Sequence, residues 1–186
     1  MNHLTGEEIP GEKRNVLIES ARIARGNIKP ISNLDCEYFD ALIIPGGFGV
    51  AKNLSNFAVT LGSGNGGPDD FQVDPSVASV IESFHASKKV IGACCIAPTI
   101  VAKVIKGVSV TLGCSSGEMF PYAGATKAIT ALGGNHVETP APCSEVCVDK
   151  ENLVVTSGGY MYDGKPHQIA DSVAAMVDKV VEIANA

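Results

Sequence analysis

The chain has 186 residues, a formal net charge of −6 and a hydrophobic fraction of 45%, with 20 glycines. This length predicts one domain over residues 1–186 that can bury a substantial core. The acidic balance without a basic run argues against nucleic-acid binding and against electrostatic attraction to anionic membranes. No apolar stretch reaches the ~18 residues that a transmembrane helix needs.

Hydrophobic periodicity predicts helices that alternate with short apolar strands along most of the chain. The expected helices cover residues 15–25, 51–57, 74–86, 99–106, 122–132 and 167–184. The expected strands cover residues 39–44, 89–93, 108–112, 145–149 and 153–156, the last two paired around a turn at 149–152. This alternation predicts an α/β protein: a flavodoxin-like, doubly wound, mainly parallel sheet with helices on both faces. Residues 1–13 are expected to form a loop, so the first strand of such a sheet is missing from the pattern.

Six cysteines occur, at positions 36, 94, 95, 114, 143 and 147. A chain of this length is not a small disulfide scaffold, and Cys143 and Cys147 lack the second cysteine or histidine pair that a zinc site needs. We therefore expect free thiols in a reducing compartment, with no bound metal and no cofactor.

The most informative segment covers residues 90–99, where an apolar strand meets two cysteines and then a helix. A nucleophile on a sharp strand-to-helix turn stands clear of the sheet, and the next backbone N–H is free to bind an oxyanion. Such a turn needs small residues two positions before and after the nucleophile. Cys95 has Ala93 and Ala97 there, whereas Cys94 is followed at that distance by a bulky residue. We expect Cys95 to be the nucleophile and Cys94 to point into the core; the alternative is that both are core cysteines.

Three segments together carry a family signature. They are Asn-His-Leu-Thr-Gly-Glu at 2–7 with residues 14–26, Ile-Pro-Gly-Gly-Phe-Gly at 44–49 with residues 51–55, and Cys-Ile-Ala-Pro at 95–98. The chain resembles the ThiJ/PfpI superfamily of class I glutamine amidotransferase-like proteins, and within it the ElbB type and its animal mitochondrial relatives. The resemblance extends from residue 2 to the C-terminal helix.

The resemblance implies that Cys95 is the nucleophile and that the backbone N–H groups of Gly47 and Ile96 form an oxyanion hole. It also implies a glutamate on a strand before residue 2, so the chain is expected to be N-terminally truncated. Glu19 is a candidate substitute acid; the alternative is a solvated helix face on which Glu19 pairs with Arg22. None of the four histidines is expected beside Cys95.

The function that the resemblance implies is glyoxalase-like chemistry on small reactive carbonyls, such as the conversion of methylglyoxal to lactate. We expect this activity to be weak or lost without the first-strand glutamate, because general acid–base catalysis contributes about 10² to 10⁴ in rate. The alternative is a non-catalytic mitochondrial protein that senses redox state through an exposed thiol or binds partners. The resemblance further implies a homodimer and a mitochondrial location, with the cytoplasm as the alternative.

Overall fold

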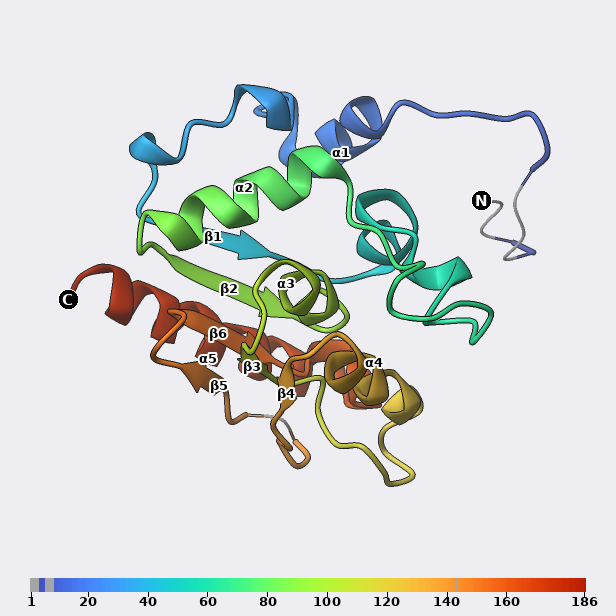
Figure 1. Ribbon diagram of the computed structural model, residues 1–186, viewed down its shortest axis with the longest axis vertical. Coiled ribbons are helices and arrows are strands. Elements are labelled where there is room, and N and C mark those ends of the chain that lie inside the picture. Colours follow the sequence, from blue (N-terminus) through green and yellow to red (C-terminus); the bar gives the residue numbers. More distant parts are fainter. Residues whose placement is uncertain (1–3, 6–8, 143) are drawn as a thin grey trace. The chain divides into compact units, whose positions relative to one another are not determined.

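The computed structural model describes residues 4–5, 9–142 and 144–186 (Figure 1). The chain forms two compact units, one ending at Leu34 and the other beginning at Asp35. The first unit contains helix α1 (Val16–Ala24), which begins where the Asn15 side chain accepts a hydrogen bond from the N–H of Ile18 at 3.1 Å. This cap confirms the helix expected over residues 15–25.

The second unit is built around a four-stranded sheet with the strand order β1-β2-β6-β5. Its strands are β1 (Ala41–Ile44), β2 (Val90–Cys94), β5 (Cys147–Asp149) and β6 (Val154–Ser157). The pairs β1–β2 and β2–β6 are parallel, and β5 is antiparallel to β6. Strands β3 (Ser109–Val110) and β4 (Asn135–His136) form a second, parallel pair. The predicted mainly parallel α/β fold is confirmed, and β4 is a strand that the sequence analysis did not predict.

The described part of this unit contains four α-helices: α2 (Pro75–Ala86), α3 (Pro98–Val104), α4 (Thr126–Ala131) and α5 (Pro166–Ala184). Figure 1 shows α5 behind strands β2 and β6, with α2 and α3 on the opposite side. Helix α2 begins as predicted, because Asp74 accepts hydrogen bonds from the first backbone N–H groups and Pro75 suits the first turn. The helix expected over 51–57 is a π-helix at Val50–Leu54 followed by a 3₁₀ turn.

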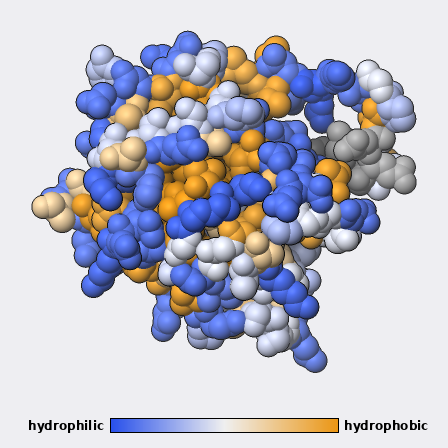
Figure 2. Space-filling view, viewed as in Figure 1, coloured by the Kyte–Doolittle hydropathy of each residue, from blue (hydrophilic) through white to orange (hydrophobic). Residues whose placement is uncertain are grey.

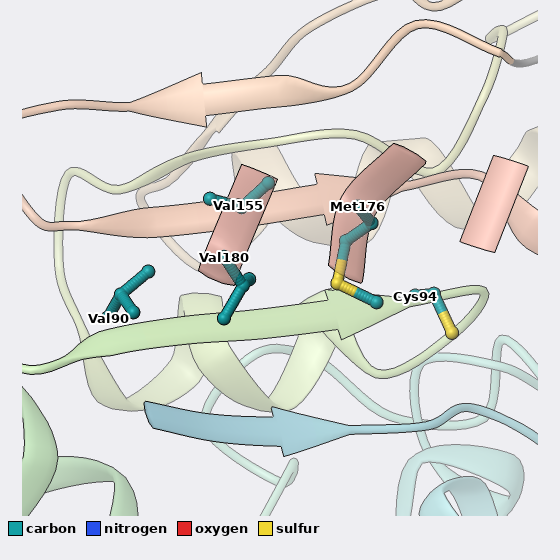
Figure 3. Close-up of a cluster of buried hydrophobic side chains, with 5 residues drawn as sticks. All are labelled: Val90, Cys94, Val155, Met176 and Val180. Atoms are coloured by element: carbon teal, nitrogen blue, oxygen red, sulfur yellow. The ribbon is translucent and has the colours of Figure 1, made fainter. Parts of the chain in front are cut away.

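One face of β2 packs closely on α5 (Figure 3). Cys94 lies there in a buried cluster whose other members are Val90, Val155, Met176 and Val180. Gly92 permits this approach, because a Cβ at that position would lie 2.7 Å from the Met176 sulfur. Cys94 therefore belongs to the core, as its neighbours in the sequence predicted.

A buried carboxylate joins β5 to β3. Asp149 accepts hydrogen bonds from the N–H of Ser109 at 2.7 Å, from the N–H groups of Glu151 and Asn152, and from the Asn152 side chain. Burial alone would raise the pKa of Asp149, but these hydrogen bonds outweigh it and lower the pKa below its ordinary value. The turn that connects the predicted strand pair is thus closed by a charged side chain.

Polar side chains cover much of the face shown in Figure 2, and apolar ones are visible near its centre. Within the described residues, no helix combines the length and the apolar character required to cross a membrane.

Candidate active site

Cys95 lies in the turn between strand β2 and helix α3. Its backbone φ is 59°, in the left-handed region that non-glycine residues rarely adopt. Such a conformation costs about 1–3 kcal/mol and persists only where the surroundings enforce it. The N–H of Cys95 donates to the carbonyl of Ser157 at 3.1 Å, which ties the turn to the end of β6. This geometry is what a strand-to-helix turn bearing an accessible side chain requires.

Glycines allow the neighbouring backbone to approach the thiol. A Cβ at Gly46 would lie 2.5 Å from the Cβ of Cys95 and 2.7 Å from the carbonyl oxygen of Cys94, so no larger residue fits there without displacement. Gly47 follows with a φ of 96°, a conformation that glycine adopts without steric cost. The turn after β1 is therefore shaped to lie directly against Cys95.

The backbone N–H groups of Gly47, Ile96 and Tyr160 lie near the Cys95 sulfur and favour its charged form. Burial raises the pKa of the Cys95 thiol, and these three donors lower it only in part, so that the pKa stays above its ordinary value. At neutral pH the resting group is accordingly an uncharged thiol, surrounded by donors that would stabilise negative charge on a nearby atom.

A cavity of about 770 Å³ opens beside Cys95. It is lined by residues between 47 and 64, by Cys95 and Ile96, by residues between 121 and 125, and by Tyr160 and Met161. The loop after β6 thus borders the cavity, as expected for a crevice at the carboxyl ends of parallel strands. None of these lining residues is Asp, Glu, Lys, Arg or His.

The structure brings together three of the four predicted site residues: Cys95, Gly47 and Ile96. Glu19 belongs to the first unit, where its carboxylate forms ion pairs with Arg22 at 3.1 Å and Arg14 at 3.6 Å. The helix-face pairing considered as the alternative for Glu19 is thus present. A role for Glu19 as an acid stays a prediction.

The histidines in the described part of the chain do not line the cavity. His85 and His167 lie on α2 and α5, and His136 accepts a hydrogen bond from the N–H of Leu112 at 3.2 Å. Burial lowers the pKa of His136, and the neighbouring carboxylate of Glu138 opposes this shift. His3 lies outside the described residues.

The five cysteines that the structure describes are free thiols, and Cys143 lies outside the described residues. No group of three or more His, Cys, Asp or Glu side chains in the described ranges is arranged to hold a metal ion.

Sequence reasoning missed the aromatic side chains around the cavity. Phe48, Tyr122 and Tyr160 line it and are all largely exposed. They come from three separate loops, so no local periodicity could have grouped them. The only signal was indirect, since Phe48 falls in a segment that carries the family resemblance.

The mainly parallel sheet, with a cysteine at the turn after β2 and a glycine turn against it, agrees with the class I glutamine amidotransferase-like resemblance of the sequence. No protein-family model matches the chain. Two curated relatives are each 46% identical over 185 residues: the rat "ES1 protein homolog, mitochondrial" and the human "Glutamine amidotransferase-like class 1 domain-containing protein 3, mitochondrial". The alignments cover 98% of this chain, which spans 66% of the length of each relative.

A solved structure gives the same assignment. The chain is similar to the isoprenoid biosynthesis protein with an amidotransferase-like domain from Ehrlichia chaffeensis, with 33% identity and a TM-score of 0.80 over 98% of this chain and 77% of that one. The chain therefore belongs to the family of the ES1 and glutamine amidotransferase-like class 1 proteins, as its signature segments predicted.

Proposed function

We propose that the chain performs glyoxalase-like chemistry on small reactive carbonyls, slowly, with Cys95 as the nucleophile. The observation that supports this most strongly is the placement of the Cys95 thiol. Its sulfur faces a cavity and lies among three backbone hydrogen-bond donors, in a turn that holds its φ at 59°. An acyl or carbonyl carbon attacked by this sulfur would place its oxygen near the same donors.

For methylglyoxal the sequence of steps begins when the sulfur bonds to the aldehyde carbon. The π electrons move to the oxygen, which receives the thiol proton and is held by the N–H groups of Gly47 and Ile96. The hydrogen on that carbon then leaves as a proton, and the adjacent carbon gains a proton through an enediolate. This leaves a thioester of lactate on Cys95. Water hydrolyses the thioester, so one methylglyoxal and one water give one lactic acid and the free thiol.

The proton transfer between carbons is the slow step of this proposal. No lining residue in the described part of the cavity carries a carboxylate or an imidazole, so the side chains that most often perform such a transfer are missing there. A positioned acid or base contributes about 10² to 10⁴ in rate. We therefore expect turnover below that of an enzyme with a placed base by about this factor.

The test is lactate formation from methylglyoxal by the purified chain, beside two variants that each remove one thiol. Cys95→Ala should abolish the enzymatic signal, whereas Cys36→Ala, which removes a partly exposed thiol elsewhere, should leave it unchanged. Equal lactate formation by the wild type and Cys95→Ala would refute the proposal.

The redox-sensing alternative has less support, because the thiolate is the form that oxidants attack and burial raises the pKa of Cys95. We also propose a mitochondrial location and a homodimer. The location rests on the rat and human relatives, both named as mitochondrial, and the homodimer rests on the family resemblance.

A further inference from the structure

We infer that the Cys95 cavity selects uncharged aldehydes with an apolar body larger than that of methylglyoxal, and that Phe48 determines this selectivity. The inference rests on the proposed function in one respect: the Cys95 thiol must be able to add to a carbonyl. It goes further by naming the part of the ligand that the cavity recognises beyond the reacting group.

The first argument is charge. No lining residue in the described part of the cavity is Asp, Glu, Lys, Arg or His, and burial raises the pKa of Cys95. A charged ligand group that leaves water needs an opposite charge or several hydrogen bonds, and its desolvation otherwise opposes binding. The backbone donors at Gly47, Ile96 and Tyr160 already surround the reacting atom. A carboxylate or ammonium group elsewhere on the ligand would find no ionic partner on the lining.

The second argument is size and surface. The cavity of about 770 Å³ far exceeds a small dicarbonyl and falls in the range of sites that hold much larger organic molecules. The Phe48 side chain is 69% exposed, and Tyr122 and Tyr160 are each 59% exposed. Exposed aromatic rings gathered around one cavity indicate a surface that a ligand covers. Phe48 follows Gly47 in the chain and lines the same cavity as Gly47 and Cys95.

These features argue against an amino-acid amide such as glutamine, whose ammonium and carboxylate groups would both enter a neutral cavity. The reaction that they fit is the addition of the Cys95 thiol to an apolar aldehyde. A carbon–sulfur bond forms, the carbonyl π bond breaks, and the thiol proton passes to the oxygen. The product is a hemithioacetal, and the step needs no oxidant, reductant or cofactor.

The experiment measures how well aldehydes protect Cys95 from alkylation by iodoacetamide, read by mass spectrometry of the Cys95 peptide. The ligands are propanal, hexanal and succinic semialdehyde, and alkylation of Cys36 in the same sample is the internal control. Each methylene buried in the cavity should strengthen protection about fourfold. Hexanal should therefore half-protect Cys95 at a concentration more than about tenfold below that of propanal, and succinic semialdehyde should protect no better than propanal.

Two variants test the role of the ring. Phe48→Ala should reduce the advantage of hexanal over propanal by about threefold or more, whereas Phe39→Ala, which truncates a 49% exposed phenylalanine outside the cavity lining, should leave it unchanged. An unchanged advantage in Phe48→Ala would remove Phe48 from the inference.

The remaining outcomes separate the two proposals. Equal protection by all three aldehydes would overturn the inference and leave the proposed function standing. Protection by none of them would overturn the proposed function, and the inference with it.

Discussion

Two groups in the second unit are held by clusters of backbone N–H donors, with opposite results. Asp149 accepts three backbone hydrogen bonds and one from an amide side chain, and its pKa falls below the ordinary value. Cys95 has three backbone N–H groups near its sulfur, and its pKa nevertheless rises. Both groups experience the same opposing force, because burial disfavours the charged form of each.

The difference lies in the acceptor and in what surrounds it. Carboxylate oxygens accept strong, short hydrogen bonds, with 2.7 Å between the nitrogen of Ser109 and Asp149, whereas sulfur is a weak acceptor. The donors around Asp149 all bind its charged carboxylate, which is part of the chain itself. Those around Cys95 face a neutral group beside a cavity. The same arrangement therefore stabilises the fold in one place and leaves binding capacity unused in the other.

Replacing Asp149 should produce the largest effect, because it breaks the filled donor cluster. In Asp149→Asn an amide NH₂ group replaces one carboxylate oxygen, so the donors that this oxygen bound lose their acceptor. We expect the free energy of unfolding to fall by about 2–4 kcal/mol at pH 7. Glu151→Gln is the matched control in the same turn, since the exposed Glu151 contributes only its backbone N–H to Asp149. Urea unfolding of both variants measures the difference.

The pH dependence of that difference follows from the lowered pKa of Asp149. A carboxyl with a lowered folded pKa stabilises the protein above its unfolded value, about 3.9, and this contribution disappears as the pH falls through the folded value. The gap between the wild type and Asp149→Asn should stay constant from pH 7 to about pH 5 and should narrow as the pH falls further. A gap that does not narrow at low pH, or that is absent, would contradict the proposed role of the charge.

Gly46→Ala should disturb the other donor cluster. The added Cβ would meet the Cβ of Cys95 at 2.5 Å, so the turn after β1 must move. We expect a loss of about 1–3 kcal/mol in the free energy of unfolding and altered alkylation of Cys95. Gly49→Ala is the control, because a Cβ there meets nothing within 4 Å and its φ of −59° suits alanine. Equal stability of the two variants would show that the turn does not press on the thiol.

The smallest perturbation leaves the sequence unchanged and measures how the reactivity of the Cys95 thiol depends on pH. It tests directly whether burial or the backbone donors dominate the pKa of Cys95. The thiolate is the reactive form and burial raises the pKa. The alkylation rate should therefore rise about tenfold per pH unit, which corresponds to about 1.4 kcal/mol. It should still rise at about pH 8.5, where the alkylation rate of a free cysteine levels off. A rate that levels off at lower pH than that of free cysteine would indicate that the backbone donors outweigh burial.

The sequence predicted those parts of the fold whose signals are local. Asp74 before Pro75 marked the start of α2, and the apolar stripe of the last helix marked α5. Small residues around Cys95 marked the turn after β2, because that turn tolerates no bulk. The chain order of these segments was enough to predict a mainly parallel sheet, since crossover connections leave few alternatives.

Other features depend on partners that are distant in sequence. Strand β4 is two residues long, and only its pairing with β3 makes it a strand. Phe48, Tyr122 and Tyr160 lie on three loops, and only the folded chain collects them around one cavity. The sequence likewise did not predict that the Cys95 cavity lacks charged side chains in its described part. That property depends on which loops the fold brings together around it.

The left-handed backbone of Cys95 has a consequence for protein engineering. Glycine adopts a φ of 59° without the steric penalty of a side chain, so Cys95→Gly relaxes the backbone at a position where cysteine is held under strain. The residue around which the cavity is organised thus detracts from the stability of the fold, as reactive groups commonly do. A screen that ranked variants by melting temperature alone would favour glycine here, and would eliminate the reactive sulfur while recording an improvement.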